Sequence, residues 1–141
     1  MRGGFLHNHI LLDPIEDLLM QLGAATRREH YVRSAGSAGF IDLTATLGQH
    51  RIACEAELAA DRVSSDLRKA QAWAATLLVI VVPTRRVAQS AQRAVNAAPG
   101  TRPVGGVWVL PLGPALTRLR DCFPFLPTSK GNRNKTTGWR S

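Results

Sequence analysis

The chain has 141 residues, 45% of them hydrophobic, and a formal net charge of +8. This length suits one domain with one core, and the hydrophobic content excludes global disorder. The longest apolar run, residues 75–83, is too short to cross a bilayer, and the N-terminus has no apolar region typical of a signal peptide. We therefore expect a globular cytoplasmic protein with no membrane partner.

The first predicted element is a helix that begins after Asp13, a good N-cap, with Pro14 at its first position. Gly23 ends this helix. Residues 1–12 then form an N-terminal lead that is prone to fraying. Residues 28–34 predict a short strand, which a turn rich in glycine and serine follows.

Residues 40–47 and 51–58 alternate in polarity and predict a hairpin with a turn between them. On the first strand, one face carries Ile41, Leu43, Ala45 and Leu47, and the other carries Phe40, Asp42, Thr44 and Thr46. On the second strand, one face carries Ile52, Cys54, Ala56 and Leu58, and the other carries Arg51, Ala53, Glu55 and Glu57.

The rest of the chain predicts helices that alternate with strands. The helices are expected over residues 61–75, 84–100 and 113–123, and the strands over residues 77–83 and 104–112. The apolar run in 77–83 is typical of a central strand covered on both faces. The whole order predicts an α/β fold with a mixed central sheet flanked by helices. Residues 13–127 then form one domain.

The charge of the chain favours a polyanionic partner, most simply DNA. Residues 128–141 hold four basic residues and no acid, so this expected flexible tail carries +4 and the body carries the remaining +4 of the total +8. The alternative is a solvated, disordered end. Neither phosphate-binding glycine motif, G-x-x-x-x-G-K-[ST] or G-x-G-x-x-G, occurs, so no nucleotide cofactor is expected. Cys54 and Cys122 have no zinc-site spacing, which fits a reducing compartment.

Three carboxylates converge on the predicted hairpin. Asp42 lies on the polar face of one strand, and Glu55 and Glu57 lie on the matching face of its partner. Ionising such close groups is costly without a cation, and oxygen ligands of this kind suit Mg²⁺ or Mn²⁺. Such a metal activates water for attack on a phosphodiester. Lys69, on the next helix, could neutralise the developing charge. The alternative is a solvated edge strand.

These motifs resemble those of the PD-(D/E)XK nucleases, the restriction-endonuclease-like superfamily that includes Holliday junction resolvases. The resemblance covers roughly residues 13–83 and implies an αβββαβ core, here with a C-terminal αβ(α) extension. GFIDLTA resembles the family's stretch around its metal-binding aspartate, with Asp42 at that position. CEAEL resembles the following (D/E)-x-K strand, with Glu55 as the metal-binding acid.

The resemblance implies a metal-dependent DNA endonuclease. Asp42 and Glu55 would hold Mg²⁺ or Mn²⁺, and Glu16 lies where some members carry a helix glutamate that completes the site. Glu57 replaces the usual lysine, and Lys69 in DLRKAQAW fits the variant with E-x-E and a displaced lysine. Glu57 would tune the site or bind a second ion. One small domain offers one site, so cutting both strands or resolving a junction would require a homodimer.

Other polar residues are candidate DNA contacts. They are Arg27, Arg28, Arg33, Ser34, Ser37 and Arg68. The two serines also fit ordinary turn chemistry. Two other functions stay open. One is a nuclease-fold DNA-binding or assembly subunit without catalysis, and the other is an interaction module whose carboxylates are merely surface groups. The preferred DNA structure, including linear duplex, flap, nick or four-way junction, is not predicted.

Overall fold

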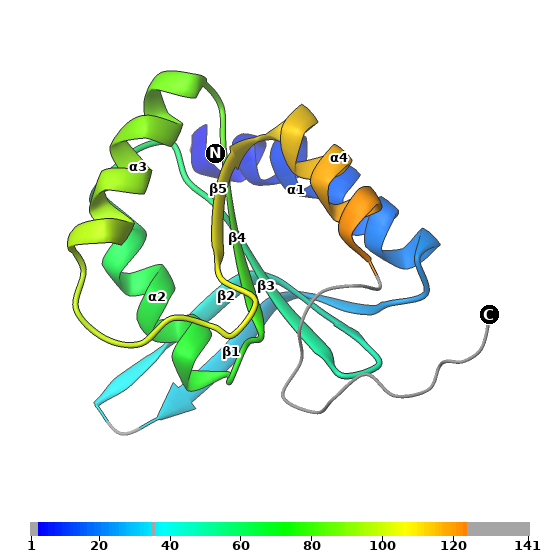
Figure 1. The fold of residues 1–141 in the computed structure, drawn as a ribbon, viewed down its shortest axis with the longest axis horizontal. Coiled ribbons are helices and arrows are strands. Elements are labelled where there is room, and N and C mark those ends of the chain that lie inside the picture. The colour runs from blue at the N-terminus through cyan, green and yellow to red at the C-terminus, as the bar shows by residue number, and fades with distance from the viewer. Residues whose placement is uncertain (1–2, 35, 124–141) are drawn as a thin grey trace.

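The computed structural model describes residues 3–34 and 36–123, which form a five-stranded sheet with helices on both faces (Figure 1). The helices are α1 (Gly3–Gln21), α2 (Val63–Ala72), α3 (Arg85–Ala97), α4 (Leu112–Cys122) and the short 3-10 helix η1 (Ala60–Arg62). The strands are β1 (Ala25–Ser34), β2 (Ser37–Leu47), β3 (His50–Ala56), β4 (Leu77–Val82) and β5 (Val107–Pro111). None of these helices combines the length and the apolar character that a membrane crossing requires.

The strands lie in the order β1-β2-β3-β4-β5. The pairs β1–β2 and β2–β3 are antiparallel, whereas β3–β4 and β4–β5 are parallel. The crossovers run through α2 and α3, because parallel neighbours need a long connection. Every residue of β4 is buried, as its continuous apolar run predicts. The predicted α/β class, the order of the elements and the mixed sheet are confirmed.

Two separate cores lie against the two faces of the sheet. The α1-side core joins α1 and α4 to the sheet through residues that include Leu12, Leu19, Leu43, Cys54 and Leu119. The α2-side core joins α2 and α3 to the other face through residues that include Ile41, Ala53, Val63, Leu67 and Ala91. Figure 1 shows α2 and α3 together on one side and α1 and α4 on the other.

Helix α1 begins at Gly3, so the prediction that it starts at Pro14 is wrong. Leu11 and Leu12 are both buried in the α1-side core. A proline inside a helix costs about 3 kcal/mol. Full burial of two leucines contributes about 1.5–3 kcal/mol each, which outweighs that cost. The apolar face of the helix therefore continues on the N-terminal side of Pro14, and the helix continues with it.

The β1–β2 hairpin is longer than predicted. Its pairing reaches from Ala25 to the tip, where Ser34 pairs with Ser37, because both strands continue into their predicted turn. Strand β3 ends at Ala56, so Glu57 and Leu58 lie beyond the strand rather than in it. The remaining boundaries differ from the predicted ones by three residues or fewer.

The predicted alternation of β2 is wrong at one point, because Ile41 and Leu43 lie on opposite faces of the sheet. Leu43 packs in the α1-side core and Ile41 in the α2-side core. The break falls at Asp42. The neighbouring strand is irregular at the same level, where Glu29 has a left-handed φ of 52°. Since regular strands alternate strictly, Asp42 occupies a local distortion of the sheet.

Candidate acidic cluster

Asp42 and Glu55 join β2 to β3 where regular backbone pairing ends. The last paired residues of these strands are Leu43 and Cys54. Beyond them, the N–H of Asp42 donates to Glu55 Oε1 at 3.3 Å, and the N–H of Ala56 donates to Asp42 Oδ2 at 2.9 Å. Each carboxyl group thus satisfies a backbone donor on the opposite strand. This pair of hydrogen bonds fixes both side chains.

Glu55 is the centre of the site. Its side chain is 1% exposed, and its Oε2 lies 3.0 Å from Lys69 Nζ. Burial and the nearby charge of Asp42 raise the pKa of Glu55 to about 8, although Lys69 acts in the opposite direction. Near neutral pH this carboxyl group therefore exchanges readily between the protonated and the ionised form.

Lys69 extends from α2 to the edge of this pair. Its Nζ donates to the carbonyl oxygen of Phe40 at 2.7 Å and lies 3.7 Å from Asp66 Oδ1. Its stem passes over Gly39, where a Cβ atom would lie 3.1 Å from Lys69 Cδ. Burial lowers the pKa of Lys69, but the charge and hydrogen bond of Glu55 and the charges of Asp66 and Asp42 together raise it. Lys69 is therefore a fixed, protonated ammonium.

Asp66 belongs to the same cluster, and the sequence analysis missed it. It lies in the first turn of α2, where the helix dipole favours an acid, and its side chain is 1% exposed. Within the described chain, no N–H or hydroxyl group donates to either of its carboxyl oxygens, and its hydrogen-bonding neighbour is the carboxyl group of Glu57. Its spacing of three residues before Lys69 places both on one helix face, which was the available signal.

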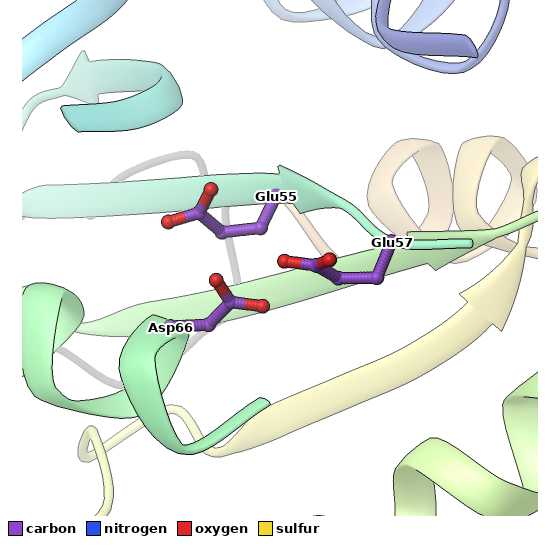
Figure 2. Close-up of side chains that lie close together, drawn as sticks. All are labelled: Glu55, Glu57 and Asp66. Atoms are coloured by element: carbon purple, nitrogen blue, oxygen red, sulfur yellow. The ribbon is translucent and has the colours of Figure 1, made fainter. Parts of the chain in front are cut away.

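Glu57 completes the cluster just beyond the end of β3. Its N–H donates to the Val81 carbonyl oxygen at 3.0 Å, which holds this residue beside β4. The carboxyl groups of Glu55, Glu57 and Asp66 point toward one another, and one oxygen from each lies within 4.8 Å of the others (Figure 2). We call these three residues the acidic triad.

Burial makes the acidic triad hold protons. It raises the pKa of Asp66 to about 11, with a further contribution from the hydrogen bond to Glu57. Burial also raises the pKa of Glu57. Two carboxyl groups that share a hydrogen bond need a proton on one of them. At neutral pH the triad therefore carries bound protons, which a cation would displace.

The donor set fits a hard divalent cation. The triad and Asp42 offer only carboxylate oxygens, which Mg²⁺ and Mn²⁺ prefer over nitrogen or sulfur. Within the described residues, Lys69 provides every ion pair that these four carboxyl groups make. No N–H or hydroxyl group of the described chain donates to the two Asp66 oxygens, so they can coordinate once the shared proton is displaced. The site therefore offers oxygen ligands of the type that such an ion prefers.

The structure does not bring Glu16 to this cluster. Glu16 lies on α1, on the opposite face of the sheet, where it accepts a hydrogen bond from Thr26 Oγ1 at 2.7 Å. Arg28 Nη1 donates to Glu16 Oε1 at 3.2 Å and to Asp13 Oδ1 at 2.8 Å. Glu16 is thus paired with a cation of its own, and Arg28, a candidate DNA contact, is engaged in the same network.

The other candidate DNA contacts lie on the surface. Arg27, Arg33 and Ser34 are exposed along β1, and Arg68 is exposed on α2 beside Lys69. Ser37 begins β2, but its side chain lies outside the described part of the chain, as does the basic tail of residues 128–141. The four exposed residues are free to meet a large ligand.

Comparison with models of known protein families finds no match for this chain. Neither a curated protein nor a solved structure matches it.

Proposed function

We propose that this protein is a metal-dependent DNA endonuclease that hydrolyses phosphodiester bonds at the acidic triad. The observation that carries the proposal is Asp66, a buried carboxyl group to which no N–H or hydroxyl group of the described chain donates, and which faces two further carboxyl groups. Natural proteins rarely bury several acids against one another without a role for them, because such crowding is costly. A cation at the triad would remove that cost.

The chain's own residues have distinct roles in this proposal. Glu55, Glu57 and Asp66 hold the ion, and Asp42 fixes Glu55 through the backbone of β2 and β3. When bound, Mg²⁺ or Mn²⁺ supplies a Lewis acid that polarises the phosphodiester and makes water more acidic. The Lys69 ammonium offers positive charge beside Glu55 for the developing phosphorane. Lys69 and Asp42 are the less buried members, so DNA would approach over them.

Two further features support DNA as the substrate. The net charge of +8 favours a polyanion, and three exposed arginines lie on β1 and α2. The order of the elements from α1 to β4, with Asp42, Glu55 and Lys69 on consecutive elements, also supports the resemblance to PD-(D/E)XK nucleases. As a single small domain, the protein would cut both strands of a duplex as a homodimer.

The test is a cleavage assay in Mg²⁺ or Mn²⁺ on linear duplex, single-stranded and four-way-junction DNA. We expect cleavage by the wild type and a loss of about 100-fold or more in Glu55→Gln and Asp66→Asn. Asp61→Asn is the matched control, because Asp61 is an exposed aspartate close to α2. It should cut like the wild type. Circular dichroism would show that each variant is folded.

A direct titration with Mn²⁺ separates binding from catalysis. The wild type and Asp61→Asn should bind the ion, and Asp66→Asn should bind it at least ten-fold more weakly. Failure of the wild type to bind Mn²⁺ would contradict the proposal. If the wild type binds DNA and Mn²⁺ but cuts none of the substrates, a DNA-binding or assembly subunit becomes the better assignment.

A further inference from the structure

Two aromatic side chains form an exposed pair on the β1–β2 hairpin. Tyr31 and Phe40 face each other across the two strands, with ring centroids 5.2 Å apart and an interplanar angle of 61°. Tyr31 is 49% exposed and Phe40 is 52% exposed. The other large apolar residues on the described surface are not aromatic; they are Ile10, Met20, Leu58 and Val104. We call Tyr31 and Phe40 the aromatic pair.

The aromatic pair lies on the sheet face opposite α2, and the backbone of Phe40 connects it to the acidic cluster. The carbonyl oxygen of Phe40 accepts the hydrogen bond from Lys69 Nζ, which is itself 3.0 Å from Glu55. Because Ile41 points into the α2-side core, the Phe40 side chain points to the opposite side of β2. A ligand on the aromatic pair would thus reach the hairpin edge two residues from Asp42.

The surroundings of the pair favour a negatively charged ligand. Arg33 is exposed and lies two residues after Tyr31, so it shares the face of the pair, opposite the small Ala38. Arg27 is also exposed on β1, but on the opposite face of the strand. Glu29 is the one exposed acid of this strand, and the chain as a whole carries +8. In Figure 1 the far end of this hairpin extends past α2, away from α1 and α4.

We propose that the aromatic pair is a stacking platform for an unpaired base of DNA, with Arg33 at the adjacent phosphate. Aromatic side chains beside basic ones are the usual means of binding single strands. An intact duplex hides the faces of its bases, so the platform selects DNA with a single-stranded segment, such as a flap, a frayed end or a branch. The proposal rests on the proposed function for its choice of DNA and defines the substrate class.

The test measures binding in EDTA, where no metal-dependent cleavage occurs. Fluorescence anisotropy would compare a labelled oligothymidylate with a duplex of equal length for the wild type, Tyr31→Ala, Phe40→Ala, Tyr31→Phe and Met20→Ala. We expect Tyr31→Ala and Phe40→Ala to bind the single strand about five-fold or more weakly. Tyr31→Phe retains the ring and should bind like the wild type. Met20→Ala removes an equally exposed apolar side chain on α1 and should also bind like the wild type.

Several results would overturn the platform. One is equal binding of the single strand by Tyr31→Ala and the wild type, and another is equal loss in Met20→Ala. A preference of the wild type for duplex over single strand would also contradict it. If light scattering shows a dimer that Tyr31→Ala converts to a monomer with unchanged single-strand affinity, the pair is an interface between two copies instead. Because this assay needs no metal, its result is independent of the cleavage assay. The stacking proposal can therefore be confirmed when the nuclease proposal fails, and it can fail when the nuclease proposal is confirmed.

Discussion

Acidic residues are partly exposed on one face of the sheet and buried on the other. On the α1 side, Asp13 and Glu16 remain at the rim, and Arg28 pairs with both. The core beneath them is apolar. On the α2 side, Glu55 and Asp66 are buried within the layer between sheet and helix, and one lysine serves both. The α1 side therefore resembles an ordinary protein interior. The α2 side instead has ionisable groups at buried positions that apolar side chains usually occupy.

This contrast separates stability from function. Replacing buried ionisable groups with apolar residues of similar volume is often neutral or stabilising, so the α2 face is not arranged for stability alone. Local departures from the rules of folding tend to mark functional sites. The following predictions test whether the α2 face depends on ions and protons in ways that the α1 face does not.

The largest expected effect on stability follows the loss of Lys69. Lys69→Met leaves the carboxyl cluster without its ion pair, and breaking a buried pair costs about 3–5 kcal/mol. Urea unfolding at neutral pH would measure this loss. A fixed Mn²⁺ concentration, about 100 times the dissociation constant for Lys69→Met, should restore about 2.7 kcal/mol and is used for both variants.

The matched variant on the other face is Leu19→Ala. Leu19 is fully buried in the α1-side core, so its truncation costs about 2–5 kcal/mol. Mn²⁺ should stabilise Leu19→Ala no more than it stabilises the wild type. If Mn²⁺ stabilises both variants by equal amounts, the cation does not take the place of Lys69, and the contrast between the faces is lost.

Without metal, the protein should become less stable as the pH rises above about 4. Folding raises the pKa of Glu55 from 4.5 to about 8 and the pKa of Asp66 from 3.8 to about 11. The folded state therefore binds more protons than the unfolded state in this range. Stability then falls with pH. Thermal unfolding in EDTA between pH 5 and pH 9 would measure the slope, and Asp66→Asn should flatten it. A wild type whose stability rises over this range would contradict the assignment of raised pKa values.

A smaller effect is expected at Gly39, under the stem of Lys69. Gly39→Ala places a methyl group 3.1 Å from Lys69 Cδ, and the ammonium is held at its far end by Phe40. A shift of 1 Å near a reacting group can cost about 100-fold in rate, so a shift of a few tenths should slow cleavage about three- to ten-fold. Gly113→Ala is the control, since nothing lies within 4 Å of the added carbon. Equal rates in both variants would show that Lys69 adjusts freely.

The smallest effect is expected from Glu16→Gln. This change weakens a partly exposed ion pair with Arg28, which is worth about 0–1 kcal/mol. Cleavage and Mn²⁺ affinity should match those of the wild type, because Glu16 lies on the opposite face from the acidic triad. A loss of metal affinity in Glu16→Gln would support the ligand set that the family resemblance implies over the set that the geometry favours.

Periodicity predicted most of the fold, because the apolar patterns of the elements are regular. It predicted that β4 is covered on both faces, and the order of the elements predicted that Lys69 lies on the helix after the hairpin. It failed at Asp42, where the strand changes the face of Ile41, since an alternation rule assumes regular geometry. Asp66 was missed because an acid in the first turn of a helix usually faces water. Its burial depends on the packing of α2 against β2 and α3, which no local pattern records.

The hydrogen bonds that Asp42 and Glu55 accept from the backbone tie these two residues to the folding of the sheet, which matters when related sequences are compared. Asp42 and Glu55 hold β2 and β3 together as well as forming part of the acidic cluster. A related protein without catalytic activity would therefore still be expected to keep both residues for folding. Asp66 makes no such hydrogen bond to the backbone of the described chain and contributes nothing comparable to the sheet. Under the proposed function, its presence or absence in a related sequence would therefore report activity, whereas that of Asp42 and Glu55 would report ancestry.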